Sequence, residues 1–461
     1  MAREATERYP PQVKFIVWNE GCERFSFYGM RSILTVYMAQ YLFLAGHEAT
    51  ANYHRFVMAC YLTPLVGGWI ADRFWGRYRT ILWLSLGYVA GHAVIAMSDS
   101  RGGLYAGLAL IAAGSGGIKP CVSAYVGDQF RPAQRKLVER VYALFYWMIN
   151  LGSFTSTLLI PELLARFGPR VAFAVPGVLM AIALAVFWAG RERYVNVPPT
   201  GPNPNGFMRV VAHALLRRAA RPPGGHWLDA ARGRFPDEAV EGAKAVLRVM
   251  GVFAAITGFW ALFDQHGSSW VLQARQMDLR IWRWELQASQ LSALNPIMVL
   301  GIIPLFQLGL YPWLERRGVR VTPLRKIGAG MFVTTLSFVA AAVLQHQIDV
   351  GGRPHGLWQI VPYLFLTAGE VLVSVTGLEF AYTQAPRTMK STIMSFWFLT
   401  IAAGNLLTAW VSELNRFQGA AFFAFFAALV FVAAIAFALV ARRYRPWDPS
   451  ADQAPGAGAA A

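Results

Sequence analysis

The chain has 461 residues, of which 56% are hydrophobic and only 15% are charged, and its mean hydropathy is +0.38. Globular domains average about 25% charged residues, so this composition excludes most classes of soluble protein and indicates a membrane protein. The net charge of +17 could indicate a nucleic-acid-binding protein, but the basic residues form short clusters between apolar runs, which is typical of membrane-protein loops.

The apolar runs are long enough to cross a bilayer, which takes about 20 helical residues. We expect an all-α membrane protein with twelve transmembrane helices, over 15–42, 50–72, 79–98, 103–127, 139–162, 169–190, 246–272, 289–314, 326–346, 357–382, 389–411 and 418–441. The segment before the first run is polar and does not resemble a cleavable signal peptide, so we expect this run to stay in the mature protein. Cys22, Cys60 and Cys121 all lie within apolar runs, which argues against disulfides and a zinc site.

Lysine and arginine positions orient the predicted helices. With both termini inside, the inside segments carry thirty of these residues and the outside loops carry nine. Cytoplasmic loops carry the excess of Lys and Arg, so we expect both termini to be cytoplasmic.

A polar segment over 191–245 divides the helices six and six. It is rich in Pro, Gly and Arg, and we expect a cytoplasmic linker with a short surface helix near 206–220. The predicted organisation is an N-terminal six-helix bundle over 1–190, this linker, a C-terminal six-helix bundle over 246–445 and a disordered tail over 446–461.

The two halves share a weak repeat. Residues 72–77 (DRFWGR) follow the second predicted helix, and residues 315–320 (ERRGVR) follow the eighth. Two six-helix halves with matching inside loops indicate the parallel repeat of major-facilitator transporters, in which the substrate binds between the halves at mid-membrane.

The first predicted helix carries charges that lipid does not tolerate. Six of its residues share one helix face, with spacings of 0, +3, +4, +7, +8 and +11: Glu20, Glu23, Arg24, Phe27, Tyr28 and Arg31. An ionised side chain at mid-bilayer costs about 2.5–3.5 kcal/mol, so this face must line a hydrated protein interior. A purely structural salt bridge is the alternative, but two cations within two turns are well arranged to bind a carboxylate.

Three further charges lie within predicted helices. Lys119 follows the glycine-rich residues 114–117, which permit close helix approach. It requires an anion or a carboxylate partner unless it extends to the membrane interface. Asp264 and Glu370 are single acids in apolar sequence, and each either binds a ligand or pairs with another helix.

Uncharged polar and aromatic residues are weaker candidates. Asn150 and Asn295 could bind a ligand or only join helices, and Tyr61 and Trp397 could line a pocket or only pack. His54 could be a proton site or an interfacial histidine.

The balance of these buried charges indicates a type of ligand. The candidate set contains four acids and three bases: Glu20, Glu23, Asp264 and Glu370, and Arg24, Arg31 and Lys119. A surplus acid can hold a proton, because desolvation favours the neutral carboxyl, and a ligand with a carboxylate and an ammonium would find partners at both ends. We therefore expect a zwitterionic substrate that moves with protons. The sequence lacks the H-E-x-x-H, P-loop and G-x-S-x-G motifs, so we expect neither an enzyme nor a metal or cofactor site.

Several motifs occur in order along the chain. Residues 20–29 (EGCERFSFYG), 67–76 (GGWIADRFWG) and 145–153 (FYWMINLGS) match E-x-x-E-R-F-x-Y-Y-G, G-G-x-x-A-D-x-x-W-G and a fifth-helix signature, and 259–265 and 369–380 are also similar. With these motifs the chain, from about 13 to 440, resembles the proton-coupled oligopeptide transporters (POT/PTR family) of the major facilitator superfamily. The resemblance implies the major facilitator fold and a symporter that imports di- and tripeptides by alternating access.

The chain also departs from the family pattern. Phe27 stands where the family usually has Tyr, so one hydroxyl contact to the ligand is lost. Phe263 stands where many bacterial members have a second acid beside Asp264, which leaves no acid for the acid–lysine gate of those members. Tyr53 and His54 look more like the animal members, in which the histidine is implicated in proton handling. The linker is too short for the two extra helices of many bacterial members.

The resemblance implies a role for each matching residue. Arg24, Arg31 and Lys119 would bind the peptide carboxylate, with Tyr28 and Asn150 near the peptide backbone.

The second half would bind the other end of the peptide. Glu370 and Asn295 would receive the amino terminus, and Trp260, Trp397 and Tyr61 would line side-chain pockets.

The resemblance also implies a proton-coupling cluster and a gate. The cluster would comprise Glu20, Glu23, Arg24, Lys119, Asp264 and His54. Arg31 and Asp264 would form a gating pair between the halves, and H+ would be the only coupling ion.

Two alternatives remain: a transporter of another solute such as nitrate, and a membrane receptor with this fold but no turnover. The intact 20–24 motif and Glu370 favour peptides. The partners would be peptides and lipid, without nucleic acid, and we expect a monomer. The excess of Arg over Lys, 36 against 6, and the short outside loops indicate a bacterial inner membrane.

Overall fold

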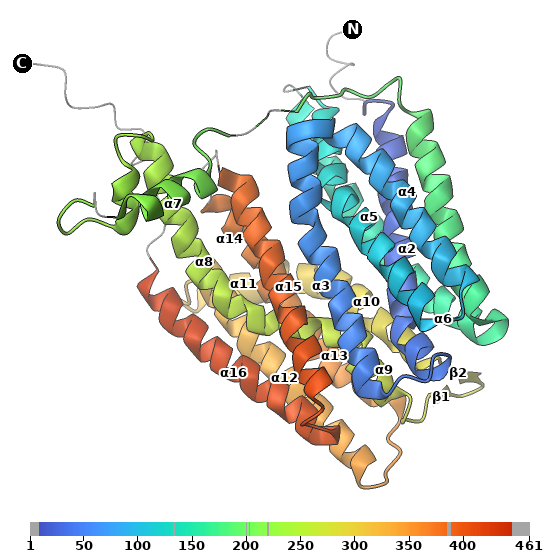
Figure 1. The fold of residues 1–461 in the computed structure, drawn as a ribbon. Helices are drawn as coiled ribbons and strands as arrows, with labels where there is room; N and C mark the ends of the chain where they lie inside the picture. The colour runs from blue at the N-terminus through green and yellow to red at the C-terminus, as the bar shows by residue number, and fades with distance from the viewer. Residues whose placement is uncertain are drawn as a thin grey trace, which may run out of the picture.

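The computed structural model describes residues 9–131, 134–199, 201, 203–218, 221–384 and 389–444, and these residues are almost entirely helical. The predicted disordered tail over 446–461 lies outside them. The helices form two groups that lie side by side, one from each half of the chain (Figure 1).

The N-terminal half begins with four helices: α2 (Val13–Gln40), α3 (Gly46–Ile70), α4 (Gly76–Met97) and α5 (Arg101–Asp128). A π-helical turn, η1 (Ala71–Trp75), joins α3 to α4. The last helix, α6 (Arg135–Ala189), reverses direction at Gly168, whose φ of 79° is a conformation that glycine adopts readily. Its two arms correspond to the predicted fifth and sixth helices.

The C-terminal half is more interrupted. Its helices are α8 (Asp237–Phe263), α9 (Ser269–Ala274), α10 (Leu294–Pro304), α11 (Tyr311–Arg316), α12 (Pro323–Asp349), α13 (Ile360–Glu370), α14 (Thr376–Thr383), α15 (Lys390–Leu414) and α16 (Gly419–Arg443). Short 3-10 and π segments join several of them: η5 (Asp264–Gly267), η6 (Ala288–Ala293), η7 (Leu305–Leu310), η8 (Gly356–Gln359) and η9 (Val371–Val375). A hairpin of β1 (Arg280–Ile281) and β2 (Trp284–Glu285) pairs Arg280 with Glu285.

Nine helical segments of the described residues are long and apolar enough to span a membrane. Two of them, Gly46–Met97 and Leu137–Ala189, have 52 and 53 residues, about twice the length that one crossing needs. Helix α2 is not among the nine, although its 28 residues are long enough, because its interior charges lower its hydropathy.

The glycine-rich segment of α5 brings three helices together. A Cβ on Gly116 would lie 2.6 Å from Thr63 of α3, and one on Gly114 would lie 2.7 Å from Tyr88 of α4. The sequence-based expectation of close helix approach at this segment is confirmed. This contact positions Lys119 one turn further along α5.

The linker contains the predicted surface helix, which is α7 (Phe207–Leu216). A 3-10 turn, η4 (Trp227–Ala231), follows it. Asp229 of this turn lies 2.7 Å from Lys244 and 2.8 Å from Arg232. Burial alone would raise the pKa of Asp229, but these two cations hold that pKa well below its usual range. The ionised carboxylate therefore ties the linker to the start of α8.

Helix α8 begins at Asp237, nine residues before the predicted start at 246. Pro236 precedes it, and its first turn contains Asp237 and Glu238. Acidic residues in a first turn stabilise the positive end of the helix dipole. The helix therefore extends into the predicted linker, because hydropathy alone marks only its apolar part.

The two halves meet along α3 and α15 and at the end of the molecule away from the linker (Figure 1). At that end, Thr35 donates to the Gly267 carbonyl at 2.9 Å, and Gln290 donates to the Leu158 carbonyl at 2.8 Å. These bonds close one end of the space between the halves.

Candidate functional site

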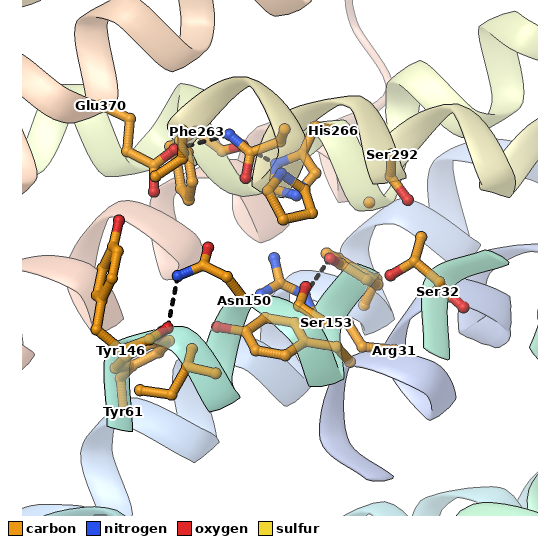
Figure 2. A pocket seen from close by; sticks show the side chains of 18 residues that line it. Arg31, Ser32, Tyr61, Tyr146, Asn150, Ser153, Phe263, His266, Ser292 and Glu370 are labelled. Atoms are coloured by element: carbon orange, nitrogen blue, oxygen red, sulfur yellow. Dashed lines mark hydrogen bonds between the residues drawn. The ribbon is translucent and has the colours of Figure 1, made fainter. Parts of the chain in front are cut away.

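A cavity of about 170 Å³ lies between the halves. Helices α2, α3 and α6 contribute Tyr28, Arg31, Tyr61 and Asn150 to its wall. The C-terminal half contributes Asn295 and Glu370, together with residues that the sequence did not indicate. Figure 2 shows Glu370, Phe263 and His266 facing Tyr61, Tyr146 and Asn150 across this space. Six of the ten predicted substrate-binding residues therefore line one cavity.

Arg31 of α2 forms an ion pair with Asp264 at the end of α8, and both side chains are buried. Its Nε also donates to the Tyr53 hydroxyl. Asn405 of α15 donates to the other Asp264 oxygen at 2.7 Å. The pair proposed from the sequence as a gate is thus a contact between the halves, and its Arg31 lines the cavity.

His54 extends this network. Its Nδ1 lies 2.7 Å from Oδ1 of Asn405, and its Nε2 lies 2.9 Å from the Ser268 hydroxyl. The imidazole is fully buried, and both nitrogens contact the opposite half. His54 is therefore enclosed by protein on all sides, and its two sequence-based interpretations, a proton site and an interfacial histidine, stay predictions.

Arg24 lies between two glutamates of its own helix. Its Nε is 3.1 Å from Glu20 and 2.5 Å from Glu23. Glu23 is completely buried, and Arg24 is 8% exposed. Two carboxylates thus share one guanidinium, and this cluster lies beside the cavity but is not part of its described wall.

The Lys119 ammonium contacts aromatic rings. Its Nζ lies 4.0 Å from the Phe27 ring centroid and 4.6 Å from that of Tyr61. The sequence predicted an anion or a carboxylate as its partner, but Nζ has no hydrogen-bond partner among the described residues. The faces of aromatic rings attract cations, so Phe27 and Tyr61 provide a surface for this charge without a hydrogen bond.

Glu370 and Asn295 meet at the opposite wall of the cavity. The Asn295 amide donates to Oε2 of Glu370 at 2.7 Å and to the Thr367 hydroxyl at 3.2 Å. The carboxylate is thus held at the end of α13, facing the N-terminal half. Asn150, by contrast, donates at 2.8 Å to the Tyr146 carbonyl of its own helix.

The two predicted tryptophans pack against each other. The rings of Trp260 and Trp397 are 5.8 Å apart and nearly perpendicular. Both are buried, and neither belongs to the described wall of the cavity. In this conformation they form a core contact between α8 and α15.

The POT family model matches residues 78–417, about three quarters of the chain. The chain belongs to the POT family. Crystal structures titled as an auto-inhibited POT family peptide transporter and as the POT family transporter PepTSo are similar to it. Their TM-scores are 0.90 and 0.89 at 43% and 42% identity, over 97% and 95% of this chain and 99% of each of theirs.

Curated relatives include solute carriers. Solute carrier family 15 member 1 from Oryctolagus cuniculus is 38% identical over 74% of this chain and 53% of its own length. Member 2 from Homo sapiens is 38% identical over 80% of this chain and 54% of its own length. The chain thus spans about half the length of the curated relatives that it matches. The family members found are transporters and solute carriers, not enzymes.

Sequence reasoning missed several residues of this POT family site. Tyr146 and His266 line the cavity, and Asn405 joins Asp264 to His54. Tyr146 lies within the fifth-helix motif and His266 two residues after Asp264, so the neighbouring motifs were an available signal. Asn405 carries no such signal, because a lone Asn in a membrane helix is often only an interhelical contact.

Proposed function

We propose that this chain is a proton-coupled symporter that imports di- and tripeptides by alternating access. The observation that carries the proposal is the cavity between the halves, with the Arg31 cation on one wall and the Glu370 carboxylate on the other. A zwitterionic peptide has charges complementary to both. The similar structures titled as POT family peptide transporters support this substrate class.

We infer that proton coupling involves the acids beside this cavity. Glu20 and Glu23 share Arg24, so the cluster has one more carboxylate than cations, and burial favours the neutral form of the surplus acid. His54 and Asp264 would respond to the same cycle through Asn405. The coupling ion would be H+, without a cofactor or a metal.

We also propose the topology of a two-bundle major facilitator with twelve crossings. The nine apolar segments, two of them of double length, and α2 add up to this number. The excess of Lys and Arg on one side supports cytoplasmic termini, and the excess of Arg over Lys supports a bacterial inner membrane. The monomer remains our expectation.

The contacts between the halves support an inward-facing state. The Arg31–Asp264 pair and the Thr35–Gly267 bond lie at the end away from the linker, which is the outer end in the proposed topology. Arg24 and Lys119 would then reach the peptide carboxylate only in another access state, after Arg31 separates from Asp264.

The direct test is uptake by the purified chain in liposomes. We expect a labelled dipeptide to accumulate only with an inward proton gradient, and collapse of the gradient to abolish accumulation. Accumulation of nitrate but not of the dipeptide would favour a different substrate. Dipeptide binding without uptake would favour a receptor, and either result contradicts the proposal.

A second prediction concerns Glu370. A charge-assisted hydrogen bond in a buried site is worth about 1.5–3 kcal/mol, or roughly ten- to a hundred-fold in affinity. If Glu370 receives the peptide ammonium, Glu370→Gln should weaken binding of a free dipeptide by this factor, measured by competition with a labelled peptide.

An N-acetylated dipeptide is the control, because it lacks the ammonium. Its binding should change far less in Glu370→Gln, and the comparison cancels general damage to folding. Equal weakening of both ligands would remove Glu370 from this role and leave it as the partner of Asn295.

A further inference from the structure

The interior of the N-terminal half contains a group of buried polar side chains that the proposed mechanism does not use. They lie on α2, α4 and α5, and α4 and α5 approach closely here, since a Cβ on Gly114 of α5 would lie 2.7 Å from Tyr88 of α4. Their side-chain polar atoms have no hydrogen-bond partner among the described residues: Asn19 of α2, Ser85, Tyr88 and His92 of α4, and Ser115 of α5. All five residues are completely buried.

These side chains form a connected set that includes the charged cluster. Ser85, Tyr88 and His92 have spacings of 0, +3 and +7, and therefore share one face of α4. The rings of Tyr88 and His92 are 5.1 Å apart. Tyr88 also lies within electrostatic range of Glu23 and Arg24.

The other two helices present matching faces. Asn19 and Glu23 are four residues apart on α2, and Ser115 and Lys119 are four residues apart on α5, so each pair shares a face. Lys119 reaches the Phe27 ring of α2, which fixes the direction of the shared face of α5. We call the region formed by Asn19, Glu23, Ser85, Tyr88, His92, Ser115 and Lys119 the N-half seam.

The far end of the seam is next to α6. The His92 side chain packs against Gly177, where a Cβ would be only 2.8 Å away. Neither ring nitrogen of His92 has a hydrogen-bond partner among the described residues.

Buried polar groups without hydrogen-bond partners, gathered in one region, indicate a bound polar ligand. Buried polar groups in proteins are almost always hydrogen bonded, either to protein or to ordered water. Internal waters make about three hydrogen bonds each to groups that would otherwise be unsatisfied. Hydroxyl, amide, imidazole and carboxylate groups together offer both donors and acceptors, which suits water better than an ion of one sign.

We propose that the N-half seam holds ordered water that connects Glu23 with His92, and that His92 and Ser115 are positioning residues for the Glu23 and Lys119 side chains. This site lies inside one half and is separate from the peptide cavity. The proposal of bound water is independent of the transport function, and only the last test below rests on it.

The first test measures thermal stability. A dry seam and a hydrated seam predict changes in Tm of opposite sign when a hydroxyl is removed. Removing an orphaned buried hydroxyl relieves a desolvation penalty, whereas removing a hydroxyl that binds water loses a hydrogen bond. We expect Ser115→Ala to lower the Tm of the purified chain by about 1–3 °C. An increase in Tm would contradict the proposal.

The matched control is Ser156→Ala. Ser156 is also completely buried, but its hydroxyl donates at 3.2 Å to the Ser153 carbonyl of its own helix. Loss of the Ser156 hydroxyl should change Tm without affecting water in the seam. An experimental structure that resolves water should then show water within hydrogen-bonding distance of Ser115 and Tyr88, and none beside Ala in Ser115→Ala. A dry seam, or direct pairing among these side chains, would overturn the proposal.

The second test compares two substitutions of His92. Leu cannot bind water, whereas Gln keeps a donor and an acceptor. We expect His92→Leu to lower gradient-driven dipeptide uptake about ten-fold, as for the loss of one buried hydrogen-bonded link, and His92→Gln to restore most of it. Equal losses in both variants at unchanged Tm would show that His92 does not act through hydrogen bonds to water. Absence of uptake in the unaltered chain would instead reject the proposed function and leave the seam to the first test.

Discussion

Glu23→Gln is expected to reduce gradient-driven dipeptide uptake by about a hundred-fold while peptide counterflow survives. Glu23 is completely buried and lies 2.5 Å from Nε of Arg24. Glutamine has nearly the same shape but resembles the protonated acid permanently, so the site can no longer gain and lose a proton. A buried charge-assisted contact is worth about 1.5–3 kcal/mol, which is up to a hundred-fold in an equilibrium. Counterflow requires no net proton movement and therefore needs only the binding and access steps.

Glu20→Gln is the matched control for this experiment. Glu20 lies 3.1 Å from the same guanidinium nitrogen but is slightly exposed, at 7%. If the deeper acid is the proton carrier, its replacement should have the larger effect on uptake. If Glu23→Gln loses uptake and counterflow equally, Glu23 has only a structural role in the cluster.

The second large effect is expected at the pair between the halves. Removing one partner of a buried ion pair leaves an uncompensated charge and costs about 3–5 kcal/mol. Asp264→Ala should therefore destabilise the outer-closed state strongly, although Tyr53 still accepts a bond from Arg31. Labels on the two halves at the outer end should report a shift to the outer-open state, measured as their separation in liposomes.

A charge exchange tests whether the two residues act as a pair. Residues in contact give non-additive effects in double mutants, so Arg31→Asp with Asp264→Arg should recover part of the outer-closed population and of dipeptide binding. Additive losses would mean that each charge acts separately, with Arg31 as a ligand-binding residue only.

The chain offers a control pair at the same interface. Arg55 and Glu413 also join the two halves, but their side chains are 43% and 58% exposed. Exposed ion pairs contribute only about 0–1 kcal/mol. Glu413→Gln should therefore leave the distribution of access states almost unchanged. A shift in access states as large as that of Asp264→Ala would show that burial does not explain the importance of the Arg31–Asp264 pair.

The sequence alone determined that the chain is a membrane protein that resembles the POT family and that the charged face of its first helix is buried. These conclusions depend on local information. Apolar runs of about 20 residues mark helices, because lipid leaves no alternative for the backbone. The spacing from Glu20 to Arg31 predicts one helix face, and α2 contains it as a single uninterrupted helix.

The start of α8 is a boundary that local hydropathy did not predict. Hydropathy marked the apolar part of this helix from 246, but the helix begins at Asp237 because Pro236 and the acidic first turn start it in a polar segment. The sequence also predicted a loop over 163–168, whereas α6 is helical up to Gly168, where the positive φ interrupts it. Boundaries depend on capping and turn chemistry that a hydropathy pattern does not contain.

The family resemblance had already paired Arg31 with Asp264, but only the tertiary structure decided the partners of Lys119 and His54. Lys119 was expected beside a carboxylate and instead lies against the Phe27 and Tyr61 rings, because the partner of a side chain depends on how neighbouring helices are rotated. Asn405 joins Asp264 and His54 across the halves, although the three residues lie on three different helical segments far apart in the sequence. Spacing along one helix predicts a shared face, but contacts between helices arise from packing, and packing is a property of the whole fold.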